Sequence, residues 1–292
     1  MATLREIRRR ITGVKNTQKI TKAMKMVAAS RFRRAQEAIV STRPYSRKLG
    51  ELLRHLITKV DVNLNPLLVS RERKSVLLVV VTGDRGLCGS FNSNIAKATL
   101  HHIQAQQGIP VKLLTIGRKG SDFFAKRPLK LIGKKVGLFG ELDFGQARGI
   151  VQEITDGYLK GEFDAVEVIY NEFKSVMQQR IVIEQVLPIP PEVTEGPKTL
   201  RSLSQVEYIY EPSSTEIIDA LVPRHLNFQL RRILLESNAS EQGARMTAMD
   251  NATENARDLI SELTLKFNNA RQAAITKELL EIVSGAEALK AS

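Results

Sequence analysis

Both ends of the chain carry the same pattern, in which apolar residues recur every three or four positions over a long stretch. The pattern covers Leu4 to Thr42 at one end and Met249 to Leu289 at the other. This spacing places apolar side chains on one stripe of a helix, and a stripe of that length needs a partner helix to cover it. The simplest partner is the other terminal helix. The sequence therefore predicts an antiparallel coiled coil of the N- and C-terminal helices, a rod more typical of transmitting force than of chemistry.

Three consecutive positions of the N-terminal stripe are polar. Counting heptads from Leu4 places Gln18, Thr21 and Lys25 on the seam between the helices. Either these side chains form a polar layer that fixes the helix register, or this part of the helix faces another protein. The pattern leaves both interpretations open.

Prolines bear on where the two long helices end. Pro44 either ends the first helix or is tolerated as a kink. The C-terminal helix is predicted to begin near Ser214, to be interrupted or curved near Pro223 and Gly243, and to run to about Val283. A helix of roughly 65 residues would span roughly 100 Å. Because that exceeds the width of an ordinary domain, other chains or solvent must cover much of it.

The middle of the chain changes period. Short β-branched runs predict strands at 75–82, 111–116, 165–170 and 180–187, and the segments between them predict helices at 91–107, 121–126 and 141–160. This alternation predicts a central Rossmann-like α/β domain with a mostly parallel sheet and an antiparallel edge. A linker-like, proline-rich stretch at 188–197 and a short strand at 205–210 are predicted to follow.

The predicted fold class is therefore α/β with long helices. Its predicted parts are an N-terminal coiled-coil helix at 1–65, the α/β domain at 66–212, and a C-terminal coiled-coil helix at 213–292 that pairs with the first.

The positive charge of the chain is concentrated in its first fifty residues. The formal net charge is +13, and Met1 to Gly50 hold 14 Lys and Arg residues against two acids, Glu6 and Glu37. This segment therefore carries +12, which favours an acidic partner such as nucleic acid, an anionic membrane or acidic protein loops. No segment has the roughly 18–20 consecutive apolar residues of a membrane span, so we expect any membrane association to come through partners.

Two glycine turns follow a strand and precede a helix, as a phosphate-binding loop does. They are Gly83 to Ser90 and Gly117 to Ser121. Neither has the spacing G-x-G-x-x-G or G-x-x-x-x-G-K-[ST], so we expect tight turns in which glycine supplies positive φ angles.

Side chains that could carry chemistry are sparse. The one cysteine, Cys88, has no histidine nearby in sequence and is predicted to be a structural thiol. The four histidines show no metal-ligand spacing, and the carboxylates show no acid–base pattern. We therefore expect no catalytic residue, no bound cofactor and no metal.

Four stretches, in order across nearly the whole chain, carry long specific motifs. They are Leu4–Ile11 with Val14–Ser30, Asp84–Gly89, Arg245–Thr253 and Asn269–Glu278. Together they closely resemble the gamma subunit of F-type ATP synthases of the bacterial type. The resemblance implies a non-catalytic central rotor shaft that couples ion flow through the membrane sector to ATP synthesis or hydrolysis on the beta subunits.

The partners that the resemblance implies are three alpha and three beta subunits, an epsilon subunit and the membrane c-ring. It implies no nucleic acid and no cofactor. It also implies a peripheral place on the cytoplasmic face of the bacterial inner membrane. The redox-regulated photosynthetic branch of the family carries an insert with a cysteine pair, and because this chain has no such pair we expect no thiol regulation.

The resemblance further implies which residues take part in coupling. Met24 and its neighbours Lys22 and Lys25 match family positions that face acidic beta-subunit loops as the shaft turns. Four C-terminal residues match positions with a similar role: Arg245, Gln272, Thr276 and Glu278.

Two functions of other classes stay open at this stage. The charge of the first helix admits a basic coiled-coil protein that binds nucleic acid, although its basic residues overlap the heptads instead of preceding them. The glycine turns admit a nucleotide-binding enzyme. Copurification separates these functions. Recovery of alpha and beta subunits at high salt indicates the rotor shaft, and recovery of nucleic acid that is lost steeply with salt indicates a nucleic-acid-binding protein. Stoichiometric nucleotide on the isolated chain indicates a nucleotide-binding enzyme.

Overall fold

A computed structural model describes residues 3–57, 65–106, 108–140, 144–175, 178–190 and 213–290. The chain divides into two compact units. The terminal unit comprises residues 1–27 and 246–292, and the central unit comprises residues 28–245. Two long helices, α1 (Leu4–Ile57) and α6 (Ser214–Lys290), contribute to both units.

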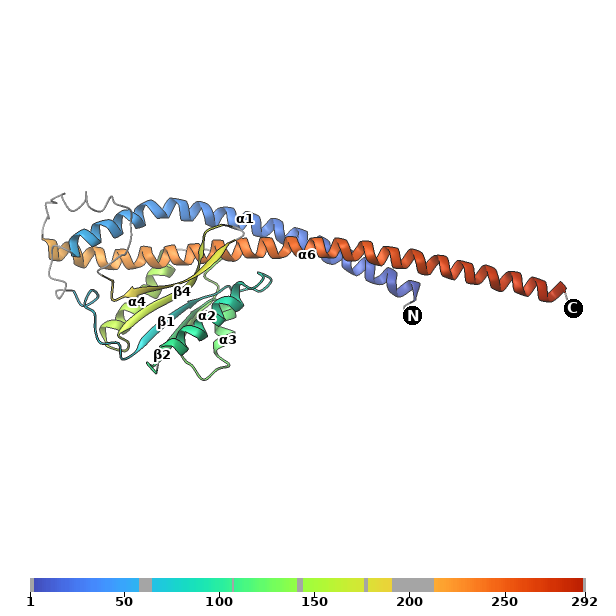
Figure 1. Cartoon of the computed structure of the whole chain (residues 1–292). Coiled ribbons are helices and arrows are strands. Elements are labelled where there is room, and N and C mark those ends of the chain that lie inside the picture. Colours follow the sequence, from blue (N-terminus) through green and yellow to red (C-terminus); the bar gives the residue numbers. More distant parts are fainter. Residues whose placement is uncertain are drawn as a thin grey trace. The chain divides into compact units, whose positions relative to one another are not determined.

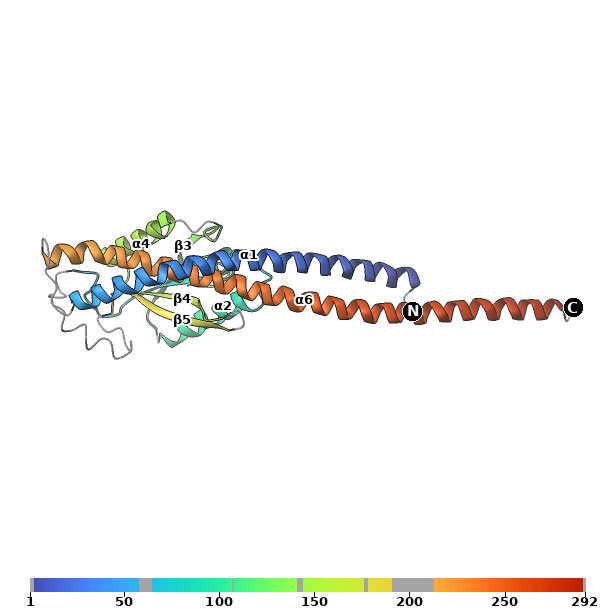
Figure 2. The same ribbon diagram turned by 90° about the horizontal axis from the view of Figure 1, so that it is seen from above.

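The terminal unit is an antiparallel pair of helices, as the sequence predicts. The guanidinium of Arg8 lies 5.8 Å from the ring centroid of Phe267, whereas Lys25, further along α1, contacts Asp250, which is earlier on α6. Residue numbers thus rise along one helix as they fall along its partner. Figure 2 shows that α6 continues past the N-terminus of α1.

Each long helix begins with a reciprocal cap. The backbone N–H of Glu6 donates to Oγ1 of Thr3 at 3.3 Å, and the N–H of Thr3 donates to the Glu6 carboxylate at 2.9 Å. At the start of α6, the N–H of Glu216 donates to Oγ of Ser213 at 3.2 Å, and that hydroxyl donates to the Glu216 carboxylate. These caps satisfy backbone donors that a helix start leaves without an intrahelical acceptor.

The prolines do not end either helix. Pro44 lies inside α1 and Pro223 lies inside α6. Each proline removes one intrahelical hydrogen bond. Around Pro44, the buried side chains of Ile39 and Leu49 hold the helix in place on both sides. The predicted end of the C-terminal helix at about Val283 is wrong, because α6 runs to Lys290. The sequence after residue 285 consists of good helix formers, which favour this continuation: Ala286, Glu287, Ala288 and Leu289.

The central unit is built on a five-stranded sheet with the order β3-β2-β1-β4-β5. Figure 1 labels its neighbouring strands β2, β1 and β4. The first four strands are parallel neighbours and β5 runs antiparallel to β4. This arrangement confirms the predicted mostly parallel sheet with an antiparallel edge. The strands are β1 (Val76–Val81), β2 (Val111–Ile116), β3 (Lys130–Lys135), β4 (Ala165–Phe173) and β5 (Gln179–Leu187).

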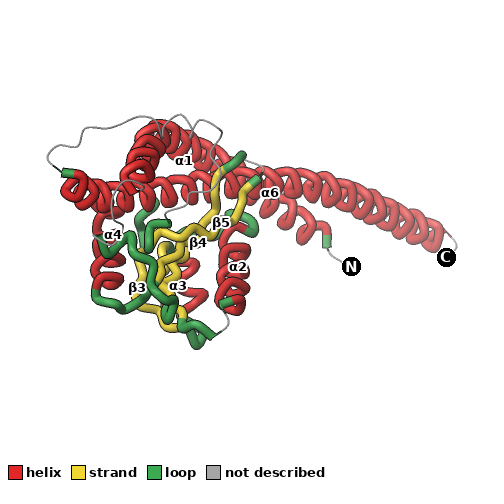
Figure 3. Tube along the Cα trace, turned by 60° about the vertical axis from the view of Figure 1, so that its left-hand side comes forward, coloured by secondary structure: helices red, strands yellow, loops and turns green. Residues whose placement is uncertain are grey.

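Two layers of helices cover the sheet, and the alternation of β1 shows how. Leu77 and Val79 pack in the core that includes α4 (Phe144–Leu159) and the buried faces of α1 and α6. Leu78 and Val80 pack on the opposite side with α2 (Phe91–Ala105) and α3 (Arg118–Phe124). Because side chains alternate along a strand, a strand buried at every position has to be covered on both faces. Figure 3 shows α2 and α4 on the two sides of the yellow sheet.

Several details of the central unit differ from the sequence prediction or lie outside the described residues. Strand β4 runs to Phe173, three residues beyond its predicted end. The sequence did not predict β3, whose three lysines and one glycine weaken its strand signal. Helix α3 begins at Arg118, three residues before the predicted start. The predicted strand at 205–210 and most of the predicted linker lie outside the described residues. The domain limits at residues 65 and 212 stay a prediction.

Candidate functional site

The polar positions on α1 form a layer within the terminal unit. The hydroxyl oxygens of Thr21 and Thr253 lie 2.7 Å apart, and Nζ of Lys25 donates to Oδ1 of Asp250 at 2.6 Å. Sliding one helix by a turn would separate both pairs, so the layer fixes the register. Of the two interpretations that the sequence left open, the structure favours the register-fixing one for Thr21 and Lys25.

A groove lies beside this layer, with a volume of about 520 Å³. Its lining mixes both signs of charge from the two helices. The lining residues are Gln18, Lys19, Lys22, Lys25, Met26, Asp250, Thr253, Glu254 and Arg257.

The predicted coupling residues on α1 share one turn of the helix, but their surroundings differ. Met24 is half-buried and Lys22 is exposed. Lys25 is already paired with Asp250. Of these two lysines, Lys22 differs in that its ammonium contacts no carboxylate among the described residues. The sequence alone did not identify Asp250 as the partner of Lys25, because only the antiparallel register shows that the two residues lie opposite each other.

The predicted coupling residues near the C-terminus lie on the surface of α6. Gln272, Thr276 and Glu278 are exposed and follow Phe267, which packs under Arg8 near the start of α1. Large apolar side chains are exposed around them: Ile275, Leu279, Leu280, Ile282 and Val283. An exposed apolar surface of this kind is typical of a segment that another chain covers.

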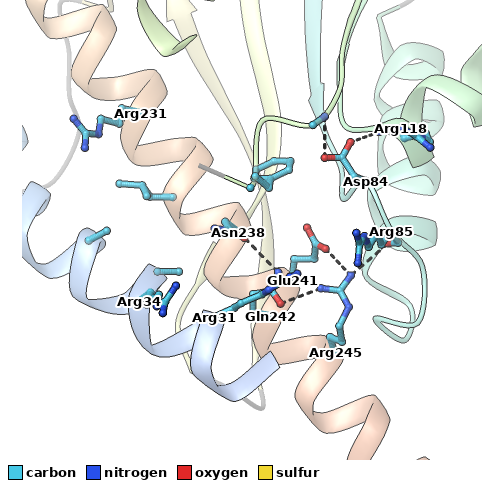
Figure 4. Close-up of a pocket in the computed structure, with 16 residues that line it drawn as sticks. Arg31, Arg34, Asp84, Arg85, Arg118, Arg231, Asn238, Glu241, Gln242 and Arg245 are labelled. Carbon is cyan, nitrogen blue, oxygen red and sulfur yellow. Dashed lines mark hydrogen bonds and ion pairs between the residues drawn. The ribbon is translucent and has the colours of Figure 1, made fainter. Parts of the chain in front are cut away.

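Arg245 lies apart from the other six, inside the central unit (Figure 4). Its guanidinium pairs with the carboxylate of Glu241 at 2.6 Å and donates to Oε1 of Gln242 at 3.1 Å. It also donates to the carbonyl oxygen of Gly86 at 3.3 Å. Burial raises the pKa of Glu241 despite the opposing charge of Arg245. Arg245 therefore ties α6 to the glycine turn after β1.

That turn needs glycine for close packing. A Cβ atom added to Gly83 would lie 2.7 Å from Cδ of Glu241. Positive φ angles occur further along the turn at Leu87 and Gly89. The predicted role of glycine in this turn is thus confirmed at Gly89, while Leu87 adopts the left-handed conformation without that freedom.

Three backbone amides at this edge of the sheet already have side-chain acceptors within the chain. Oδ1 of Asp84 accepts from the N–H of Arg118 at 2.9 Å, and Oδ2 accepts from the N–H of Gly137 at 3.0 Å. The Gly83 N–H is taken by Oδ1 of Asn92 at 2.8 Å. A phosphate group would find these donors occupied, in agreement with the absence of nucleotide-binding glycine spacing in both turns.

Cys88 is buried within the same turn. Its sulfur accepts from Nδ2 of Asn92 at 3.2 Å. Burial raises the pKa of the Cys88 thiol, although the charge of Arg245 opposes the rise. A thiol in this setting is a poor nucleophile, in line with the predicted structural role.

Metal binding and membrane insertion would each need features of their own. Within the described parts of the chain, no three side chains of the types His, Cys, Asp or Glu cluster as a metal site would require. No helix within those parts is long and apolar enough to cross a membrane.

Comparison with known proteins gives consistent matches over the whole chain. The family model described as ATP synthase matches residues 3–289. The ATP synthase gamma chain of Chloroherpeton thalassium is 52% identical, with all of both chains covered. That of Chlorobaculum parvum is 53% identical over 99% of this chain and all of the relative.

Solved structures show the same fold. A chain of the mitochondrial ATP synthase of Euglena gracilis matches 99% of this chain with a TM-score of 0.73 at 21% identity. A chain from the central stalk and c-ring structure of the Tetrahymena thermophila mitochondrial ATP synthase covers 80% of this chain, with a TM-score of 0.63 and 29% identity.

Proposed function

The chain belongs to the ATP synthase gamma-chain family, and from this we propose that it is the turning shaft of the central stalk. In this proposal the shaft couples ion flow through the membrane sector to ATP synthesis or hydrolysis on the beta subunits. As a gamma chain, it is a non-catalytic stalk subunit of the complex. The observation that carries the proposal is 52% identity to a gamma chain along the full length of both proteins.

The terminal unit has the properties that a shaft requires. A shaft transmits torque only if its two helices do not slide past each other. The Thr21–Thr253 contact and the Lys25–Asp250 ion pair oppose such sliding. The exposed apolar side chains from Ile275 to Val283 then need cover, which a ring of alpha and beta subunits would supply.

The proposed partners are three alpha subunits, three beta subunits, an epsilon subunit and the c-ring. The basic segment from Met1 to Gly50 is suited to acidic loops of the beta subunits. The chain is part of a membrane-associated complex, and we place it on the cytoplasmic face of the bacterial inner membrane. The nucleic-acid alternative has no support among the proteins that the chain resembles.

Within this function, we assign coupling to the seven residues that the family motifs single out. The accessible ones among them are suited to direct contact with a partner, while Arg245 would act through the turn that it holds. The residues are Lys22, Met24, Lys25, Arg245, Gln272, Thr276 and Glu278.

Native mass spectrometry of the assembly tests the proposal. The chain is tagged, the complex is extracted from membranes in mild detergent, and it is captured in high salt. The expected result is one tagged chain with three alpha and three beta subunits. Capture of nucleic acid that is lost steeply with salt, or of the chain alone with bound nucleotide, would overturn it.

A further inference from the structure

Apart from the groove in the terminal unit, the central unit holds a cavity of about 660 Å³ whose lining is rich in arginine (Figure 4). The arginines come from separate elements that the fold brings together: α1, the turn after β1, the start of α3, and α6. They are Arg31, Arg34, Arg85, Arg118, Arg231 and Arg245.

The carboxylates of this cavity do not balance its positive charge. Only Asp84 and Glu241 line it. Glu241 pairs with Arg245, and Asp84 accepts backbone N–H groups of Arg118 and Gly137.

Five guanidinium groups are therefore left without a carboxylate partner within the described residues: Arg31, Arg34, Arg85, Arg118 and Arg231. Nε of Arg231 is buried without any hydrogen-bond acceptor. Its guanidinium faces the ring of Phe144, 5.5 Å from the centroid, which does not satisfy that N–H group. The lining therefore carries an excess of positive charge, and a bound anion would reduce that excess.

The cavity also lies where α/β folds usually bind ligands. Asp84 and Arg85 follow β1, Arg118 follows β2, and Gly137 follows β3, so the carboxyl ends of three parallel strands meet at it. In open α/β sheets, ligands bind in the crevice outside the carboxyl ends of the strands. Since Asp84 takes the backbone amides here, recognition is left to the arginine side chains.

We propose that this cavity binds a multivalent inorganic phosphate anion of the pyrophosphate or triphosphate class. The guanidinium group presents paired donors that match two phosphate oxygens at once. The volume lies within the range of roughly 300–1,000 Å³ that small-molecule sites occupy, which favours a compact anion over an acidic protein segment. The proposal is independent of the stalk function.

Isothermal titration calorimetry of the full-length chain with sodium tripolyphosphate, at about 150 mM salt to screen non-specific attraction, tests the proposal. We expect one site per chain. The double variant Arg31→Gln with Arg34→Gln should weaken binding about tenfold or more, since it removes two charge-assisted contacts. Both side chains are exposed on α1, so the variant should remain folded.

The matched control removes two exposed arginines outside the cavity, by Arg9→Gln with Arg148→Gln. Binding by this variant should remain within about twofold of the parent chain. Equal weakening in both double variants, or several equivalent sites per chain, would reduce the effect to net charge and overturn the proposal. Tighter binding of a hexaglutamate peptide than of tripolyphosphate would also overturn it, in favour of an acidic protein segment.

Discussion

Among single residues, those of a partly buried charge network in the central unit should affect stability most. Arg232 donates to both carboxylate oxygens of Glu184, at 2.6 and 2.8 Å, and lies 3.5 Å from the carboxylate of Glu236. Burial alone would raise the pKa of Glu184. The charge of Arg232 and hydrogen bonds from Gln229 and Tyr170 outweigh burial and hold that pKa below its ordinary value.

Removal of Arg232 should destabilise the chain strongly. Arg232→Met keeps most of the side-chain volume but leaves half-buried Glu184 and buried Glu236 without their nearest countercharge. Breaking a fully buried pair in this way costs about 3–5 kcal/mol, and because both side chains of the Arg232–Glu184 pair are partly exposed we expect about 2–3 kcal/mol. Urea unfolding followed by circular dichroism measures the loss. The control Arg257→Met removes an arginine whose side chain is 71% exposed and should cost within about 0.5 kcal/mol. A loss below about 1 kcal/mol for Arg232→Met would contradict the role of the network.

Glu236 should make stability depend on pH in the opposite sense to Glu184. Burial raises its pKa, although Arg232 and Arg43 oppose the rise; Glu172 and Glu184 add to it. The folded chain thus takes up this proton at a higher pH than the unfolded chain does, so stability is lost as pH rises through the folded pKa. Oε2 of Glu236 is buried without a hydrogen-bond partner. Glu236→Gln should therefore raise Tm relative to the parent at pH 8 more than at pH 5; an equal difference at both pH values would contradict this.

Cys88 should react slowly in the folded chain. The buried thiol has a raised pKa, and the thiolate is the reactive species. Iodoacetamide labelling at pH 8, followed by mass spectrometry, should be at least about tenfold slower in buffer than in 6 M urea. Comparable rates in the two conditions would show that the turn containing Cys88 opens readily.

At the scale of the elements, the turns between strands and helices leave the least room for a side chain at a glycine position. Gly117 precedes α3 with a φ of 97°, and an added Cβ would lie 2.0 Å from the carbonyl oxygen of Thr82. Gly117→Ala should cost at least about 2 kcal/mol, from backbone strain together with that clash. Gly149 lies inside α4 with nothing within 4 Å of its added Cβ, so Gly149→Ala should stabilise by about 0.5–1 kcal/mol. Thermal unfolding of both variants checks the pair, and equal shifts would contradict the argument.

The elements also show how far the sequence predicts this molecule. Strands β1 and β2 were predicted closely because buried β-branched runs have an unambiguous period, and the terminal helices because their stripes are long. Strand β3 was missed because its stability comes from pairing with β2 rather than from its own residues. The pairing of Lys25 with Asp250 and of Asp84 with distant backbone amides depends on tertiary register, which one sequence does not reveal. The placement of Arg245 inside the central unit was not foreseen, since a motif match gives a role without a location.

For the whole molecule, the proposed function makes Met24 the position where we expect a substitution to disturb coupling most. Met24 is half-buried, beside exposed Lys22 and ion-paired Lys25. Met24→Lys adds an ammonium next to Lys25, which already occupies the carboxylate of Asp250. We therefore expect the new charge to pair with a carboxylate outside the chain, on acidic beta-subunit loops. In a partly desolvated interface, one such pair contributes on the order of 1–3 kcal/mol. That would stabilise one rotational position over the others and disturb energy transmission around the cycle.

ATP hydrolysis and ATP-driven proton pumping, measured in the same membranes, test this prediction. The variant Met24→Lys should retain hydrolysis and lose pumping, because assembly survives while transmission fails. Met24→Leu keeps the apolar volume without the charge and should behave as the parent enzyme does. Met26→Lys adds the same charge at a side chain that is 61% exposed, so it separates a general charge effect from one specific to position 24. An unchanged pumping-to-hydrolysis ratio in Met24→Lys, or equal losses in Met24→Lys and Met26→Lys, would remove Met24 from the coupling residues. The family assignment would stand, because native mass spectrometry tests it separately.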